Sequence, residues 1–460
     1  MIHQDPTVKN KHPRGLYLLF FTEMWERFSY YGMRGILILY LSKSVVEGGL
    51  GISSRDASLI YGFFTGFVYF TPIIGGWFAD NYLGQRKSIT MGGITMMFGQ
   101  FALFAINDQN GLYLGLLLLI IGNGFFKPNI STLVGQLYEQ NDDRKDSAFS
   151  IFYMGINLGA FLSPLVVGYV AEEAFSVKGE DGHILSYGYK YGFLIAGIGM
   201  FIGQLLYNVL GKQYLGKVGV SIEGRKNHHV EMGEKIPLTK MEKDRIWVIF
   251  IFAVISIFFW AGFEQAGSSL SLYTDKFISK KIAFGDSICV IPTAWFQSIN
   301  AFFIVLLAPV FAVFWQCVLG KKISTPVKMG LSMILLGLGF LFMLGAVFER
   351  GGNIEDPSIK ASVIWIIFTY FFHTLGELCL SPVGLSAVTK LSPVKLASFM
   401  MGIWLLSSFI ANIAGGYIAA YVQQLGPKNI FTMMTIFSMA LGIIILKLSV
   451  WIERKMHGIR

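Results

Sequence analysis

The feature that most constrains the fold of this chain is a series of long stretches with almost no charged residues. Many of them exceed about 18 residues, the length at which an apolar helix can cross the roughly 30 Å hydrocarbon core of a bilayer. Of all residues 14% are charged, whereas a soluble domain usually has about 25%. This composition argues against a cytosolic enzyme, a secreted disulfide protein, a nucleic-acid binder and a disordered chain. It predicts a polytopic protein embedded in a lipid bilayer.

The apolar runs are too long and too uniform for the alternating strands of a barrel, so we expect helices. The first run is read as a retained helix because no small-residue cleavage site follows it. The three cysteines lie in apolar runs, which indicates no disulfide framework. We expect twelve spanning helices, at residues 16–41, 58–79, 88–106, 111–134, 147–171, 189–210, 246–273, 288–316, 328–349, 361–389, 396–422 and 429–452.

The distribution of basic residues predicts the orientation of the chain. Twelve spans put both termini on one side, and most of the 37 Lys and Arg residues fall in the segments on that side. The positive-inside rule makes that side cytoplasmic, in a multi-pass protein of the cell inner (plasma) membrane. The expected order is a cytoplasmic N-terminus at 1–15, a six-helix bundle at 16–210, a cytoplasmic linker at 211–245, a second six-helix bundle at 246–452 and a cytoplasmic tail at 453–460.

The two expected bundles resemble each other in sequence. LGQRK at residues 83–87 follows the second helix, and LGKK at residues 319–322 follows the eighth. GYVA at residues 168–171 ends the fifth helix, and GYIA at residues 416–419 lies in the eleventh. Together these matches favour a duplicated bundle, the plan of a secondary transporter that rocks about a central site.

Seven ionisable residues lie inside the expected spans, and each costs about 2.5–3.5 kcal/mol on insertion scales unless it has a partner or a wet cavity. They occupy the first and fourth helices of each bundle: Glu23, Glu26, Arg27, Arg34, Lys127, Glu264 and Glu377. One interpretation is a purely structural network of ion pairs. However, the positive and negative residues are separated: the first bundle has a net positive intramembrane charge and the second a net negative one. This separation favours a binding site.

A cavity with Arg34 and Lys127 on one wall and Glu264 and Glu377 on the other suits a zwitterion with separated charges. The carboxylates are also proton sites, because burial favours the neutral acid and a nearby cation favours the carboxylate. Five aromatic residues provide apolar walls with polar tips, namely Tyr30, Tyr31, Tyr69, Trp260 and Trp404.

Two motifs carry a resemblance to a known family. EMWERFSYYG at residues 23–32 matches the pattern ExxERFxYYG, and FYMGINLG at residues 152–159 is similar to FYxxINxG. GWFAD at residues 76–80, followed by Gly84 and Arg86-Lys87, resembles the cytoplasmic loop motif of the major facilitator superfamily. The chain thus resembles the proton-dependent oligopeptide transporters, a branch of that superfamily.

The resemblance implies an all-α major facilitator fold and proton-coupled symport of di- and tripeptides by alternating access. It implies substrate-binding residues Arg27, Tyr30, Tyr31, Arg34, Tyr69, Lys127, Asn157, Trp260, Glu264, Asn300, Glu377, Trp404 and Ser408. Among these, Arg27, Arg34 and Lys127 would face the peptide carboxylate, and Asn157, Asn300 and Glu377 the amino terminus. It implies proton-coupling residues Glu23, Glu26, Arg27, Lys127 and Glu264, with Glu264 exchanging partners with Arg34. It implies gating residues Asp80 and Arg86 on the cytoplasmic side and the pair Arg55 and Asp275 on the outer side.

The sequence also departs from the family pattern. Animal members have a proton-linked His after an Ile-Tyr pair, whereas Gly62 follows Ile60-Tyr61 here, so proton transfer falls to the carboxylates. Residues 211–245 are too short for the two extra helices of many bacterial members. Asn300 is followed by Ala301 where the family often has Pro.

Other functions compete with peptide symport. They are import of another small solute, such as an amino acid or an anion, and a nutrient sensor that binds without transport. We expect no enzymatic activity, because no nucleotide-binding loop or metalloprotease motif is present. His373 and Glu377 have the spacing of metal ligands but lack a third, so we expect neither metal nor cofactor. The expected partners are peptides and protons, not nucleic acid, and the protein is expected to work as a monomer.

Overall fold

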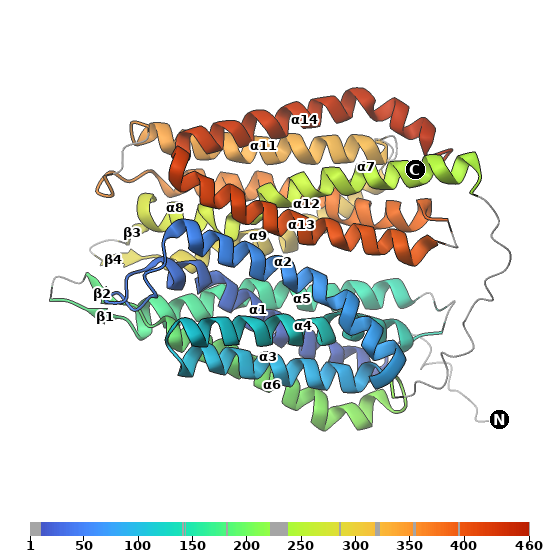
Figure 1. Cartoon of the computed structure of the whole chain (residues 1–460), viewed down its shortest axis with the longest axis horizontal. Coiled ribbons are helices and arrows are strands. Elements are labelled where there is room, and N and C mark those ends of the chain that lie inside the picture. The colour runs from blue at the N-terminus through green and yellow to red at the C-terminus, as the bar shows by residue number, and fades with distance from the viewer. Residues whose placement is uncertain are drawn as a thin grey trace. The chain divides into compact units, whose positions relative to one another are not determined.

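The computed structural model describes residues 11–139, 142, 144–180, 183–220, 238–284, 287–317, 323–352, 356–393 and 396–459. Within these residues the chain is almost entirely helical (Figure 1). The long helices are α1 (Arg14–Ser42), α2 (Ser54–Phe78), α3 (Gln85–Ala105), α4 (Gln109–Gln136), α5 (Arg144–Tyr169), α6 (Tyr189–Leu215), α7 (Lys240–Phe263), α9 (Ser298–Gln316), α11 (Thr325–Glu349), α12 (Val363–Leu391), α13 (Ala397–Leu425) and α14 (Pro427–Lys455).

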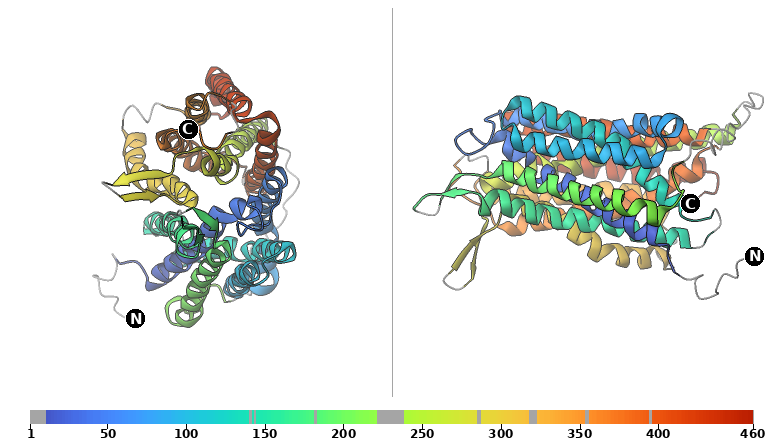
Figure 2. Two further views of the ribbon diagram at one scale, coloured as in Figure 1. Left: turned by 90° about the vertical axis from the view of Figure 1, so that its left-hand side faces the viewer. Right: turned by 90° about the horizontal axis from the view of Figure 1, so that it is seen from below.

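Short elements lie between or extend the long helices. Two are π-helical, η2 (Ala79–Leu83) and η3 (Val170–Ala174), and two are 3-10 helices, η5 (Glu264–Gly267) and η6 (Thr293–Gln297). The remaining short elements are α8 (Ser269–Phe277), β1 (Val177–Lys178), β2 (Ile184–Ser186), β3 (Lys281–Phe284) and β4 (Ser287–Val290). The strands form two antiparallel hairpins, β1–β2 and β3–β4, which project beyond the helix ends (Figure 2).

The prediction of an all-α polytopic chain is confirmed. Eleven helical segments of the described residues are long and apolar enough to cross a membrane. They do not include α1, a helix of 29 residues whose hydropathy is lowered by Glu23, Glu26, Arg27 and Arg34. Helix α1, which the apolar run at 16–41 predicted, carries four of the seven ionisable residues and would be missed by hydropathy alone.

Two expected helices differ from the structure. The helix expected at 246–273 is interrupted by η5, at a Gly-containing turn that starts with Glu264. The helix expected at 288–316 begins too early, because residues 287–290 form β4 and the helical turn starts after Pro292. Proline has no backbone N–H to continue the hydrogen bonds of a β-hairpin, whereas its fixed φ angle suits the first turn of a helix.

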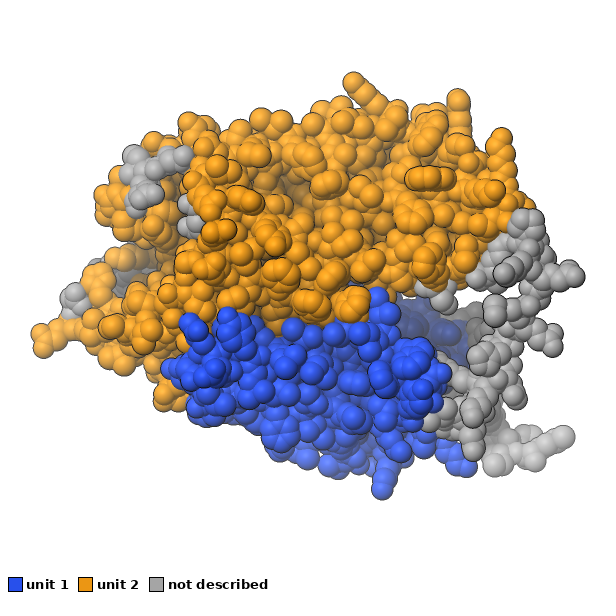
Figure 3. Space-filling view, viewed as in Figure 1, with its two compact units in different colours: residues 1–31, 71–163, 193–231 blue, residues 32–70, 164–192, 232–460 orange. Residues whose placement is uncertain are grey.

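The described chain packs as two compact units, coloured in Figure 3. Unit 1 comprises Met1–Tyr31, Thr71–Ser163 and Phe193–Glu231, and unit 2 comprises Gly32–Phe70, Pro164–Gly192 and Met232–Arg460. These units group segments by packing, and the division into two six-helix bundles stays a prediction.

Unit 1 owes its close helix packing to small residues. A Cβ atom on Gly92 of α3 would lie 2.5 Å from the carbonyl oxygen of Gly122 on α4, and one on Gly99 would lie 2.9 Å from that of Gly115. Glycines spaced in this way bring two helix backbones together, which provides dispersion contacts where no hydrophobic effect acts between helices in lipid.

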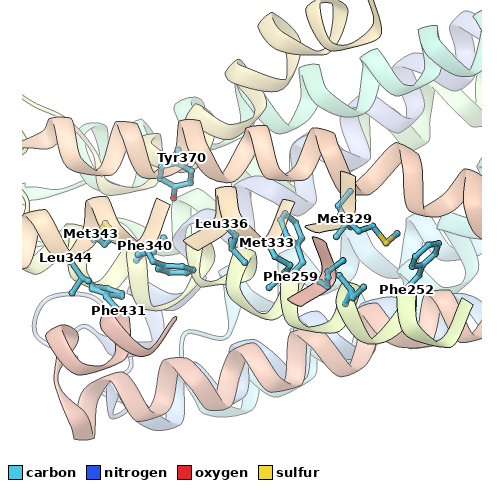
Figure 4. Packing of buried hydrophobic residues seen from close by; sticks show 14 of the residues in the cluster. Phe252, Phe259, Met329, Met333, Leu336, Phe340, Met343, Leu344, Tyr370 and Phe431 are labelled. Atoms are coloured by element: carbon cyan, nitrogen blue, oxygen red, sulfur yellow. The ribbon is translucent and has the colours of Figure 1, made fainter. Parts of the chain in front are cut away.

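Unit 2 has a large core of aromatic and sulfur-containing side chains. Phe259 of α7, Phe340 of α11 and Phe431 of α14 are fully buried in it and lie together with Tyr370 of α12 (Figure 4). At another point of unit 2, α2 passes α13 at a pair of glycines. A Cβ atom on Gly62 would lie 2.6 Å from the Cα atom of Gly416, so this crossing tolerates no side chain without a backbone shift.

Candidate functional site

A buried triad of charges forms on α1 in unit 1. Arg27 Nε lies 2.9 Å from Glu23 Oε1 and 2.6 Å from Glu26 Oε2, and the three side chains are at most 4% exposed. Glu23 and Arg27 are one helical turn apart, which places them on the same face of α1. One guanidinium is thus shared by two carboxylates inside a segment that we expect to cross the membrane.

Helix α4 supplies further polar groups to this triad. Asn123 donates from Nδ2 to Glu26 Oε1 over 3.4 Å, and Lys127, one turn later, is close enough to act electrostatically on Glu26. Sequence reasoning selected Lys127 but missed Asn123. The available signal was the spacing of four residues, which puts the two on one face of the helix.

The second motif positions α5 against the triad. A Cβ atom on Gly155 would lie 2.9 Å from the ring of Phe20, and one on Gly159 would lie 2.9 Å from Cβ of Arg27. The glycines of FYMGINLG therefore let α5 approach α1 at the point where Arg27 projects. Between them, Asn157 is 6% exposed and donates to the carbonyl oxygen of Tyr153 over 2.9 Å.

A second ion pair lies in unit 2. Arg34, in the C-terminal half of α1, pairs with Glu264 and also donates to the hydroxyl of Tyr61 on α2. A Cβ atom on Gly267 would collide with that hydroxyl, so glycine at this position gives Tyr61 room to reach Arg34. The break between α7 and α8 at η5 therefore presents Glu264 to α1, and the predicted partnership of Arg34 and Glu264 is present in the structure.

A third polar group in unit 2 joins α9 and α12. Asn300 donates from Nδ2 to Glu377 Oε2 over 2.9 Å and to Thr374 Oγ1 over 3.0 Å. Glu377 is partly exposed, and among the described residues Asn300 is its hydrogen-bond donor. The arrangement leaves carboxylate surface available to a ligand with donor groups.

The predicted aromatic residues occupy different surroundings. Tyr30 is buried beside Tyr31, with ring centroids 5.3 Å apart, and Arg27 lies over the Tyr30 ring. Trp260 is partly buried in a group with Phe259 and Phe263, whereas Trp404 is 8% exposed within the unit 2 core. Tyr69 and Ser408 are partly exposed, on α2 and α13. Their assignment to a peptide pocket stays a prediction.

The predicted outer ion pair has a different cation. Asp275 binds Lys43 and Lys280, each over 2.8 Å, whereas Arg55 is exposed and forms no ion pair with another described residue. In this structure Asp275 therefore pairs with Lys43 and Lys280 and not with Arg55, and the gating role of Arg55 and Asp275 stays a prediction. Lys43 directly follows the end of α1 and contacts α8, and Lys280 lies three residues after the end of α8. Both lysines therefore lie nearer than Arg55 to the carboxylate of Asp275.

These outer lysines are charged at physiological pH. Burial disfavours their charged forms, but the carboxylate of Asp275 outweighs it and raises the pKa of both Lys43 and Lys280. Because the pKa of each lysine is raised, its ion pair with Asp275 stabilises the folded protein at neutral pH. This stabilisation is lost only when the pH rises through the pKa of the lysine in the folded state. The neighbouring Glu172 of η3 accepts from the backbone N–H groups of Thr293 and Ala294 over 2.7 and 2.9 Å.

The cytoplasmic loop motif is ordered within unit 1. Gln85 donates to Asp80 over 3.2 Å, and Arg86 donates from Nη1 to the carbonyl oxygen of Gly216 over 2.9 Å. Arg86 therefore ties the start of α3 to the segment after α6. The predicted latch function of Asp80 and Arg86 is not tested by these contacts and stays a prediction.

His373 is fully buried next to Phe340. Among the described residues, no group of three or more His, Cys, Asp or Glu side chains is placed to hold a metal ion.

Long apolar helices with buried, partnered charges are typical of membrane transporters rather than of enzymes. The sequence model of the POT family matches residues 86–221 and 212–437. The chain therefore belongs to the POT family and has the major facilitator fold.

Three similar proteins illustrate this relationship. The chain is 34% identical to the uncharacterized transporter YclF of Bacillus subtilis, over 97% of the chain and 96% of the relative. It is 33% identical to the peptide transporter YePEPT of Yersinia enterocolitica, with the same coverage. A crystal structure of a mutant peptide transporter POT in complex with alafosfalin has a TM-score of 0.85 at 35% identity, covering 97% of this chain and 96% of that one.

Proposed function

We propose that this protein imports di- and tripeptides in symport with protons by alternating access. The observation that carries the proposal is the buried triad, in which Arg27 is shared by Glu23 and Glu26. Glu23 and Glu26 share one guanidinium, so one of them can take up a proton while Arg27 keeps a carboxylate partner. Buried ionisable groups of this kind in membrane helices commonly belong to proton relays.

Protonation of the triad links proton binding to substrate binding. When one glutamate is neutral, Arg27 keeps one carboxylate partner and gains capacity for a second anion. A peptide carboxylate fits this role, because Arg and carboxylate form charge-assisted hydrogen bonds. Lys127, on the neighbouring α4, adds positive charge for the same ligand.

The amino terminus of the peptide is assigned to unit 2. The partly exposed carboxylate of Glu377 is held in position by Asn300, so its remaining lone pairs are oriented before the ligand arrives. Relatives named as peptide transporters and a solved structure with bound alafosfalin support peptides as the substrate class.

The pair Arg34–Glu264 is assigned to the conformational change. Separating the two charges without new partners would cost several kcal/mol at this level of burial. We therefore propose that the pair opens only when a proton or a substrate group replaces one partner. The remaining assignments in this proposal are both termini in the cytoplasm, insertion in the inner membrane and function as a monomer.

Uptake into proteoliposomes tests the proposal. With an inward proton gradient, alanyl-alanine is expected to accumulate, and a protonophore is expected to abolish the accumulation. Accumulation of free amino acids or anions instead of peptides would favour another small-solute importer. Peptide binding without flux would favour a nutrient sensor.

A further inference from the structure

Two cavities lie side by side at one end of unit 2. The larger, of about 780 Å³, is lined in part by Gly426 and Pro427, and the smaller, of about 520 Å³, in part by Tyr187 and Pro292. Helix α14 runs for 29 residues, or ~43 Å, from Pro427 to the C-terminal end of the chain. The cavities therefore lie at the end opposite the C-terminus, and we call them together the outer vestibule.

Both cavities share three charged residues, Lys43, Asp275 and Lys360. The lining is rich in cations, which also include Lys276, Lys280, Lys281 and Arg350.

The acids of the vestibule already have partners. Asp275 pairs with both Lys43 and Lys280, Glu47 lies 3.9 Å from Lys43, and Glu173 pairs with Lys178 over 2.5 Å. The carboxylate of Glu172 accepts from backbone N–H groups instead of a lysine. The described acids thus leave a surplus of positive charge in the vestibule.

Lys360 lines both cavities and contributes to this surplus. Its ammonium donates to the carbonyl oxygen of Lys276 over 2.6 Å and forms no ion pair with a described acid. Partial burial, and then the neighbouring cation of Lys280, lower the pKa of Lys360, with Arg350 acting in the same direction. Arg350 is itself buried and donates to the carbonyl oxygen of Ile359 over 2.6 Å, which positions the backbone next to Lys360.

We propose that the outer vestibule is a first-contact site for the carboxylate of an incoming peptide, held between Lys360 and Lys43. This inference rests on the proposed peptide uptake and its orientation. A cation-lined cavity raises the local concentration of anions and their association rate. Because Lys43 also binds Asp275, a carboxylate at Lys43 competes with Asp275 and weakens the connection between the end of α1 and α8.

Substitution of Lys360 tests this site in proteoliposome uptake. Lys360→Ala is expected to raise the KM for alanyl-aspartate about threefold at low salt, with Vmax unchanged, because charges at the rim of a site act mainly on association. The KM for alanyl-lysine is expected to change less, and the effect on alanyl-aspartate is expected to fade at about 0.5 M salt. Lys360→Arg is expected to restore the KM.

Lys190→Ala is the matched control, since Lys190 is exposed at the start of α6 and lines neither cavity. An unchanged KM for alanyl-aspartate in Lys360→Ala, or the same change in Lys190→Ala, would overturn the proposed site. Absence of peptide uptake by the unsubstituted protein would instead overturn the proposed function, and this inference with it.

Discussion

Glu377→Gln separates the proposed binding role of this carboxylate from its structural role. Glutamine has nearly the same shape and keeps an oxygen that accepts from Asn300, so the contact between α9 and α12 is retained. Only the negative charge is lost. Because Glu377 is partly exposed and has no ion pair among the described residues, the midpoint of thermal unfolding is expected to stay the same or rise slightly.

The expected loss of affinity follows from the hydrogen bond that the peptide amino terminus would make. A hydrogen bond to a charged group contributes about 1.5–3 kcal/mol. Since about 1.4 kcal/mol corresponds to a factor of ten, the variant is expected to bind alanyl-alanine about 10- to 150-fold more weakly. N-acetyl-alanyl-alanine has no ammonium group to donate to residue 377. Its affinity is therefore expected to be about the same for the variant and the unsubstituted protein, within about twofold.

The assay is competition by each peptide against labelled peptide in counterflow, without a proton gradient, so that proton coupling does not enter. Glu349→Gln is the matched control, because Glu349 binds Ser362 and Trp365 away from the proposed site. An equal loss of affinity for the two peptides, or none for alanyl-alanine, would refute the role of Glu377.

Three further predictions concern the triad, the outer ion pair and the glycine crossing. Glu26→Gln is expected to abolish proton-driven accumulation of peptide but to spare counterflow, and unchanged accumulation would remove this glutamate from the coupling mechanism. Asp275→Asn is expected to lower the midpoint of thermal unfolding at a cost of about 3 kcal/mol, since Lys280 loses its carboxylate partner and Lys43 keeps only Glu47 at 3.9 Å, whereas Asp356→Asn in an exposed loop is the neutral control. Gly62→Ala is expected to lower the unfolding midpoint by an overpacking cost of about 1–3 kcal/mol, whereas Gly402→Ala meets no atom within 4 Å and is expected to have no such effect. Equal unfolding midpoints for Asp275→Asn and Asp356→Asn would contradict the ion pairs of Asp275. Equal midpoints for Gly62→Ala and Gly402→Ala would contradict the close contact between Gly62 and Gly416.

The helices were predictable from the sequence because lipid demands long apolar segments, and ionisable residues inside them are conspicuous. Arg34 and Glu264, far apart in sequence, were paired from the family resemblance and are found together. The hairpin β3–β4 was not predictable by the same reasoning, since its short run of apolar residues next to Pro292 also suits a helix start.

The outer ion pair shows a different limit of sequence reasoning. Arg55 and Lys43 are both basic residues near helix ends, and sequence alone gives no distance from either to Asp275. The structure resolves the choice by packing, because the chain after α1 brings Lys43 to α8. Asn123 was missed for another reason: an uncharged amide costs less in a membrane helix than a charge and stands out less in the sequence.

The central claim is that peptide and proton move together, and luminal acidification tests it most directly. The protein is reconstituted into liposomes that contain a pH-sensitive dye, with equal pH on both sides and a clamped membrane potential. The account predicts that external alanyl-alanine acidifies the lumen, and that Glu26→Gln admits peptide without acidification. Peptide entry into the unsubstituted protein's liposomes without a change of luminal pH would contradict proton-coupled symport.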